Sequence, residues 1–175
     1  LNITLAGGSA GGLWSTVGEA IGQAIRTQYP GSAFTYAPGN EMANVTSVVN
    51  GDAEIGLILH PANKIAREGR EPYTSPVTDF YVLATIYDNT PAQWVMRKEF
   101  ADRYGVKTIQ DIKEKQVPVK INVNQKGFAY EAVFKDVLET YGITYDDIES
   151  WGGDVLFLSW VQSFELMKDR RVDIS

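Results

Sequence analysis

The 175-residue sequence contains no cysteine and only one histidine, His60. The absence of cysteine excludes disulfide bridges, thiolate-ligated zinc or iron–sulfur sites and a thiol nucleophile. One histidine is too few for a histidine-ligated zinc site. We therefore expect no metal and no cofactor in this protein. A membrane-spanning helix is also not expected, because no apolar run reaches the roughly 18 residues that such a helix needs.

Positive charge is also scarce. Sixteen Lys and Arg residues stand against 22 Asp and Glu residues, which gives a net charge of −6. Proteins bind nucleic acids and anionic membrane surfaces through clustered cations, and the sequence shows no such cluster, so we expect no nucleic-acid partner. The content of hydrophobic residues, 44%, is typical of a globular chain, and the length suits one domain or two small lobes.

Hydrophobic patterning predicts two similar β-α-β-α-β halves, over residues 1–58 and 117–175. The expected strands of the first half are Asn2–Ala6, Ala33–Ala37 and Ala53–Leu59, and those of the second are Val117–Val123, Ile148–Trp151 and Val172–Ile174. Glycine-rich or polar loops separate these strands from amphipathic helices. The predicted fold class is α/β, with mainly parallel sheets flanked by helices.

Two lobes follow from this repeat, a first lobe over 1–87 and a second over 88–175. Apolar, β-prone runs at Phe80–Tyr87 and Gln93–Arg97 are predicted to be hinge strands between them. Ligands of parallel α/β sheets bind at the carboxyl ends of the strands, so we expect a ligand in a cleft between the lobes. The last strand opens at Val172 and stops at Ser175, so we expect the chain to be a fragment with an incomplete second lobe.

The strongest local motif is the glycine-rich loop Gly7–Gly12, GGSAGG, between a strand and a helix. Glycine permits close backbone approach, and the free N–H groups of the following helix suit a carboxylate or phosphate. Leu13 occupies the position of the P-loop lysine, and Ser9 that of the middle glycine of a dinucleotide fingerprint, so neither motif is present. A tight turn without a ligand is the alternative. The predicted ligand-binding residues here are Gly8, Ser9, Gly12, Leu13 and Trp14.

Further candidates lie where other strands lead into helices. Asn40 and Asn44 flank the start of the second helix, where Asn40 alternatively serves only as an N-cap. His60 follows the third strand and is alternatively a packed or surface side chain. In the second half, the equivalent loop supplies three more candidates, Asn124, Gln125 and Lys126, although a lone lysine is commonly just solvated.

No catalytic residue is predicted. Gly7–Gly11 matches the G-x-S-x-G elbow of hydrolases, but it follows the first strand, and the single histidine has no evident orienting acid. Glycine-rich loops produce this string easily. We therefore expect a binding protein rather than an enzyme.

Several segments together resemble one known family. The opening ITLAGGSAGGLWSTVG, the segments GNEMAN and NGDAEIGLIL, and the later YGITYDD are similar to the TAXI family of solute-binding receptors of TRAP transporters. The resemblance implies a two-lobed periplasmic or otherwise extracytoplasmic receptor, longer than this chain, whose signal peptide is no longer present here. It also implies that a small-molecule solute is captured between the lobes and delivered to a TRAP permease in the membrane.

The sequence departs from that family in its loops. Asn40-Glu41 stands where the family usually has Gly-Ser, and a bulkier loop ending in Gly127-Phe128 replaces a small one. Glu41, Gly127 and Phe128 join the predicted site on this basis. The implied ligand is a small carboxylate-bearing solute, an amino acid or organic acid, with an amine that Glu41 pairs as one option. A sensory or regulatory module of the same plan remains open, as does an enzyme such as a porphobilinogen-deaminase-like protein, which would need a cysteine for its cofactor.

Overall fold

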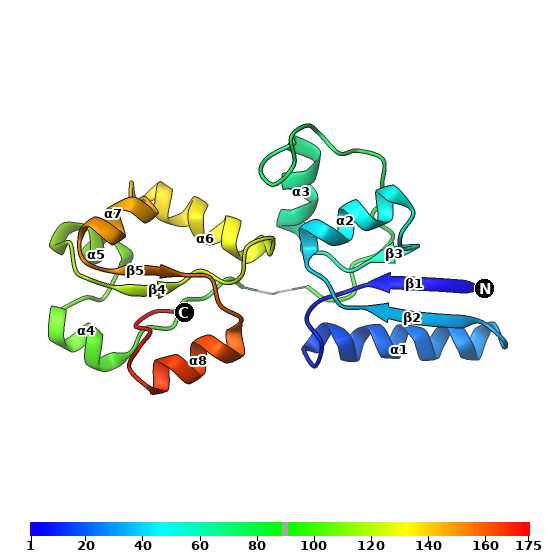
Figure 1. Cartoon of the computed structure of the whole chain (residues 1–175), viewed down its shortest axis with the longest axis horizontal. Coiled ribbons are helices and arrows are strands. Elements are labelled where there is room, and N and C mark those ends of the chain that lie inside the picture. The colour runs from blue at the N-terminus through cyan, green and yellow to red at the C-terminus, as the bar shows by residue number, and fades with distance from the viewer. Residues whose placement is uncertain (89–90) are drawn as a thin grey trace. The chain divides into compact units, whose positions relative to one another are not determined.

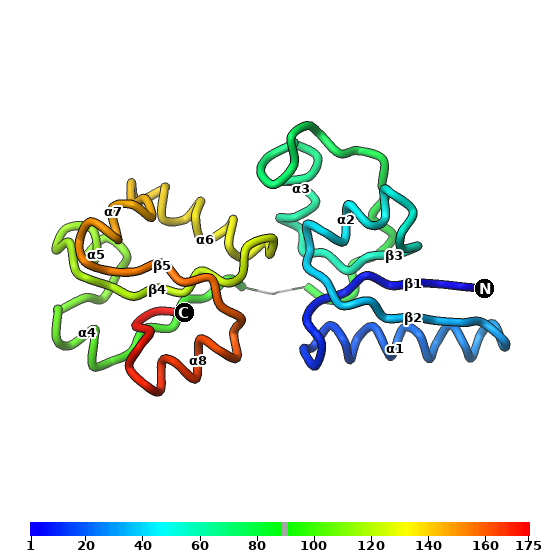
Figure 2. Tube along the Cα trace, in the orientation of Figure 1, coloured from blue at the N-terminus to red at the C-terminus, as the bar shows by residue number. Residues whose placement is uncertain are grey.

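The computed structural model describes residues 1–88 and 91–175. It consists of two compact units: unit 1 comprises Leu1–Ile86 with Gly127–Ala129, and unit 2 comprises Tyr87–Lys126 with Tyr130–Ser175. Figure 1 labels the helices and strands of each unit, and Figure 2 traces the chain through them. Each unit is a parallel sheet with helices, which confirms the expected α/β class. Among the described residues, no helix combines the length and the apolar character needed to cross a membrane.

Unit 1 alternates strands and helices along the chain. Its elements are β1 (Asn2–Ala6), α1 (Leu13–Gln28), β2 (Ala33–Ala37), α2 (Glu41–Asn50), β3 (Ile55–Gly56) and α3 (His60–Glu68). The strands form one parallel sheet in the order β2-β1-β3. Because the three strands are parallel, the loops that follow them emerge at one edge of the sheet.

Helix α1 packs on the sheet through glycines rather than through its apolar side chains. A Cβ atom on Gly18 would lie 2.4 Å from the Tyr36 ring, and one on Gly22 would lie 2.4 Å from the Phe34 ring. Only glycine permits this close approach of a helix to two aromatic rings. The buried face of α1 is therefore set by Gly18 and Gly22, a feature that the hydrophobic pattern of the helix does not reveal.

Unit 2 repeats the pairing order of unit 1. Its elements are α4 (Lys98–Tyr104), α5 (Ile109–Lys115), β4 (Lys120–Asn122), α6 (Ala129–Thr140, with Ala129 assigned to unit 1), α7 (Tyr145–Ser150), β5 (Asp154–Leu156) and α8 (Trp160–Lys168). Strand β4 pairs in parallel with β5 on one side and, through a single bridge at Ile121, with Ile174 on the other. This matches the order β2-β1-β3 and confirms the internal repeat expected from the sequence.

The core of unit 2 lies against β4. Three apolar residues spaced two apart, in β4 and directly beside it, are almost fully buried: Val119, Ile121 and Val123. They pack with Phe134 and Leu138 from α6. Alternating strand residues reach the same face of a sheet, so this cluster anchors the helix to the strand.

The two expected hinge strands differ in outcome. Described residues 80–88 form no strand, whereas the segment Gln93–Arg97 pairs antiparallel with 173–175 through a bridge at Met96 and backbone hydrogen bonds of Val95. Tyr81 is 89% exposed and Leu83 is 81% exposed. The residue types favour a strand, but a strand also needs a hydrogen-bonding neighbour, and residues 80–88 have none in the described part of the chain.

Three further strand predictions need correction. The expected strand Ile148–Trp151 belongs to α7 and the turn after it, because Thr144 and Asp147 form a capping box that starts a helix there. The actual strand is β5, a few residues later. The third strand of unit 1 is limited to Ile55–Gly56, and the expected strand Val172–Ile174 is reduced to the bridges made by Ile174.

Candidate ligand-binding site

Three loops meet at the carboxyl edge of the unit 1 sheet. Gly7–Gly12 leads from β1 into α1, 38–40 leads from β2 into α2, and 57–59 leads from β3 into α3. Because the three strands are parallel neighbours, these loops are held side by side by the sheet itself. This edge is where doubly wound sheets bind their ligands.

Asn44 joins two of these three loops, those that follow β1 and β3. Its side chain is 1% exposed, and its amide nitrogen donates to Gly7 O at 3.0 Å and to Leu57 O at 2.7 Å. Both amide protons are therefore used within the protein. The structure thus places Asn44 beneath the loops as the residue that fixes their spacing.

The first part of the glycine-rich loop is packed tightly. A Cβ atom on Gly7 would lie 2.3 Å from the Tyr36 ring, and one on Gly8 would lie 3.3 Å from the ring of Trp14. The Tyr36 hydroxyl donates to Gly8 O at 3.0 Å. Gly8 is buried and Trp14 is half-buried, so the indole ring covers the buried end of the loop.

The second part of this loop is open to solvent. Ser9, Gly12 and Leu13 are exposed. The N-cap residue of α1 is Gly12, which offers no side-chain cap, and the first turn of the helix contains no acidic residue. Free N–H groups and the partial positive charge of a helix start favour an anion. The start of α1 therefore has the right electrostatics for a carboxylate or another oxyanion.

The start of α2 differs, because its N–H groups already have partners. The Asn40 side chain accepts from Ala43 N at 2.9 Å, which confirms the N-cap alternative for this residue. Glu41, at the first helical position, is buried, and its carboxylate accepts from Ala129 N at 3.2 Å. Burial raises the pKa of the Glu41 carboxyl group, although backbone hydrogen bonds oppose the shift. An anionic ligand is disfavoured at this helix start.

The segment Gly127–Ala129 completes this part of unit 1. Gly127 O accepts from Met42 N at 3.3 Å, and Phe128, between the two hydrogen-bonded positions, is half-buried. Gly127 has φ of +87°, and a Cβ atom there would lie 3.2 Å from the Asn40 amide. Both the backbone conformation and the space therefore require glycine at this position.

His60 begins α3 and is exposed. Within the part of the chain that the structure describes, no group of three His, Asp or Glu side chains could hold a metal ion.

Three predicted residues belong to unit 2, in the loop after β4. Asn124 is buried with φ of +72°, and its own side chain accepts from Gln125 N at 2.8 Å. Gln125 is half-buried. Lys126 is exposed, and its ammonium group lies 4.6 Å from the centroid of the Phe157 ring, a cation–π contact.

A buried polar residue that sequence reasoning missed holds the corresponding edge of unit 2. Asn122, in β4, accepts from Leu158 N at 2.9 Å and donates to the Ser175 hydroxyl at 3.2 Å. That hydroxyl also accepts from Ser163 at 2.6 Å. The sequence signal for this role was an asparagine within the mainly apolar run Val119–Val123. A buried amide is retained only where its hydrogen bonds are satisfied, so such an asparagine indicates a structural contact.

A solved structure shares this fold. It is the alkanesulfonate-binding protein SsuA from Xanthomonas axonopodis pv. citri bound to MOPS, with a TM-score of 0.54 and 13% sequence identity. The match covers 99% of this chain and 53% of that protein, so the chain spans about half of its length. At this identity the likeness shows the fold, which is that of a periplasmic binding protein.

A family model supplies the assignment that the fold alone leaves open. The model described as the NMT1-like family matches residues 5–175, which include every loop described above. The chain therefore belongs to the NMT1-like family.

Proposed function

We propose that this chain belongs to an extracytoplasmic solute-binding receptor that captures a small carboxylate-bearing solute, an amino acid or organic acid. Membership of the NMT1-like family and the fold shared with a solute-binding protein support this role. The main observation that supports this proposal is the start of α1. This helix follows an exposed glycine loop, and no side chain caps its first N–H groups. Such a helix start holds an anion through backbone N–H groups.

The chemistry of unit 1 favours one orientation of the solute. The loops that follow β1, β2 and β3 contain no lysine or arginine, so backbone N–H groups of the first loop take the negative end. Trp14 covers that loop and offers an apolar face to the rest of the solute. Glu41, which lies at the start of α2, favours a solute with an amine over one with a second carboxylate.

The wider role is also a proposal. The receptor passes its solute to a membrane transporter of the TRAP type, as the resemblance to the TAXI family implies, and binds without chemical turnover. The lobes 1–87 and 88–175, and their closure on a bound solute, are part of the same proposal. A differential affinity for the closed state would drive that closure.

Calorimetry with a panel of small carboxylates, sulfonates and neutral analogues tests the proposal. We expect a carboxylate to bind and to leave the solution chemically unchanged. Trp14→Ala should weaken its binding by about 1–3 kcal/mol, because a large contact surface is lost. Tyr29→Ala, at the other end of α1, should leave the affinity unchanged. Binding of no carboxylate, or equal affinity in Trp14→Ala, would contradict the proposal.

A further inference from the structure

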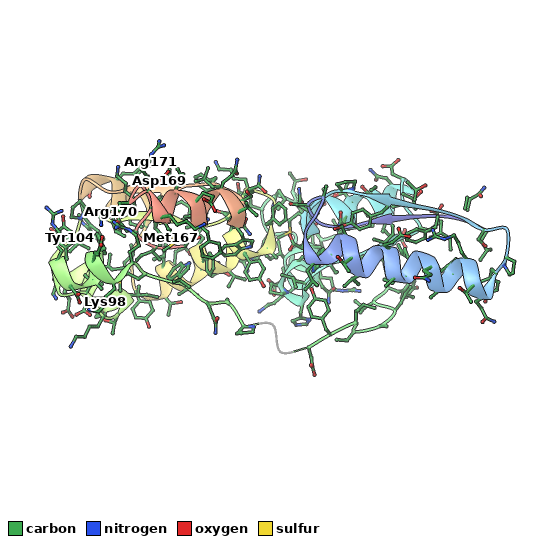
Figure 3. The ribbon with its side chains drawn as sticks, turned by 90° about the horizontal axis from the view of Figure 1, so that it is seen from below. Lys98, Tyr104, Met167, Asp169, Arg170 and Arg171 are labelled. Atoms are coloured by element: carbon green, nitrogen blue, oxygen red, sulfur yellow. The ribbon has the colours of Figure 1, made fainter. Side chains whose placement is uncertain are left out.

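Unit 2 contains a basic pocket at the start of β4, at the end of this strand opposite the loop that follows it. The cavity has a volume of about 330 Å³ and lies between α4, the start of β4 and the turn after α8. Figure 3 labels Tyr104 and Arg170, which line it from α4 and from that turn. Four cationic and two anionic side chains line the pocket, an excess of two positive charges: Arg97, Arg103, Lys120 and Arg170 against Glu99 and Asp173.

The pocket is at the opposite end of β4 from the predicted ligand loop. Lys120 is the first residue of β4, whereas Asn124 follows the end of that strand. A ligand bound here would therefore be a second one, and its binding does not depend on the proposed solute site.

Arg97 forms a fixed side of the pocket. Its side chain is only 18% exposed, and its guanidinium donates to the Asp173 carboxylate at 2.5 Å and to Val172 O at 2.9 Å. Asp173 also accepts from Lys120 N at 2.9 Å. The negative charge of Asp173 is thus compensated by Arg97 and by a backbone N–H group of β4.

The second carboxylate is shared as well. Glu99 pairs with Arg170 at 3.0 Å and with Arg97 at 3.3 Å. Arg170 has φ of +61°, a left-handed conformation that turns the chain after α8 toward this pocket. Both carboxylates are therefore occupied by Arg97 and Arg170.

Arg103 and Lys120 are left without a carboxylate. Among the residues that the structure describes, neither side chain forms an ion pair, and the guanidinium of Arg103 lies 5.4 Å from the Tyr104 ring centroid. Neighbouring cations repel one another, and this repulsion is relieved by a multiply charged anion placed among them. Guanidinium groups bind oxyanions through paired N–H donors.

We infer that this pocket binds a small, multiply charged oxyanion of the phosphate or sulfate class through Arg103, Lys120 and Arg170. The sequence showed no run of cations, because these residues are far apart along the chain. They come together only when α4, β4 and the turn after α8 pack in unit 2. In a chain with a net charge of −6, this pocket is a local reversal of charge.

The test uses the 175-residue chain and inorganic phosphate, with sulfate and glycerol phosphate as parallel arms that separate free anions from phosphate monoesters. Ionic strength is kept constant with sodium chloride, because exposed charges respond to salt itself. Isotope-edited NMR should show saturable shifts of the Arg103 and Lys120 amide signals. Isothermal titration should then give an affinity that falls at least tenfold in the Arg103→Gln/Lys120→Gln variant.

The matched control is Lys98→Gln/Lys135→Gln, which removes two positive charges from residues that do not line the pocket. We expect this variant to bind phosphate as the unchanged chain does. The inference is overturned if both double variants lose affinity equally, if chloride at the same ionic strength produces the same shifts, or if the shifts map elsewhere. Because the NMR titration is done on the unchanged chain, it decides the question even if a variant fails to fold.

Discussion

Asn44 shows how one side chain organises the candidate site. It donates both amide protons to backbone carbonyl groups of two different loops, at Gly7 and at Leu57. Buried donors and acceptors that lose their partners cost far more than the net value of the hydrogen bond. The residue therefore fixes the positions of two loops of the candidate site.

Replacement of Asn44 by aspartate keeps the shape of the side chain and removes both donors. We expect Asn44→Asp to lower the free energy of unfolding by at least about 2–3 kcal/mol, since two buried carbonyl groups lose their donor and a carboxylate is buried beside them. Urea denaturation followed by circular dichroism measures the change. Asn50→Asp, exposed at the end of the same helix, serves as the control. A loss no greater than that of the control would show that Asn44 does not hold the loops.

Glu41 predicts a pH effect. Burial raises the pKa of its carboxyl group in the folded protein above the ordinary value of 4.5, so the folded state binds more protons than the unfolded state just above that pH. Stability from this group is full below 4.5 and is lost as pH rises through the folded pKa.

Glu41→Gln should remove this pH dependence, because glutamine imitates the protonated carboxyl group. We expect the two proteins to have similar free energies of unfolding at low pH, and the variant to become the more stable one as pH rises. Denaturation series from about pH 4 to 8 measure the difference. Glu68→Gln, at the exposed end of α3, controls for the change in net charge. Parallel curves for the wild type and Glu41→Gln would refute a buried, ionising Glu41.

At the scale of elements, side-chain caps are signals that the sequence itself carries. Asn40 is an N-cap, as the alternative interpretation of this residue predicts, and Thr108 caps α5 in the same way. Each uses a side-chain oxygen that accepts from a backbone N–H three residues later. These signals are local, because the cap and its partner are neighbours in the chain. Strands were predicted less well: Ile148–Trp151 forms mostly helix, and 80–88 forms no strand.

The cap of α2 can be tested directly. Asn40→Ala removes the acceptor of Ala43 N and should cost about 1 kcal/mol of stability, whereas Asn40→Asp retains a capping oxygen and should cost less. Chemical denaturation of the two variants under identical conditions gives the comparison. An equal loss in both would mean that the capping hydrogen bond contributes nothing measurable.

At the scale of the whole molecule, the described part of the link between the two units is exposed. Residues 81–88 form neither helix nor strand, and they carry large apolar side chains that face solvent. Proteases cut where several residues of backbone are accessible without unfolding a packed core.

Brief chymotrypsin treatment should therefore cut first after Tyr81 or Leu83, and mass spectrometry identifies the site. Tyr81→Ser/Leu83→Ser should slow this first cut by removing the preferred side chains. Earlier cleavage within α1 or α6 would contradict the prediction, since both helices are packed against sheets.

The sequence by itself determined the α/β class, the internal repeat, the glycine-rich loop and the capping signal of Asn40. Each of these depends on residue types at short spacing or on hydrophobic periodicity, which local steric and hydrogen-bonding preferences express directly. Only the tertiary structure decided which apolar runs pair as strands, why Gly18 and Gly22 face β2, and how Asn44 and Asn122 join separate segments. It also gathered Arg103, Lys120 and Arg170 into one pocket. These features depend on contacts between residues distant in the chain, and such contacts form only when the sheets and helices pack.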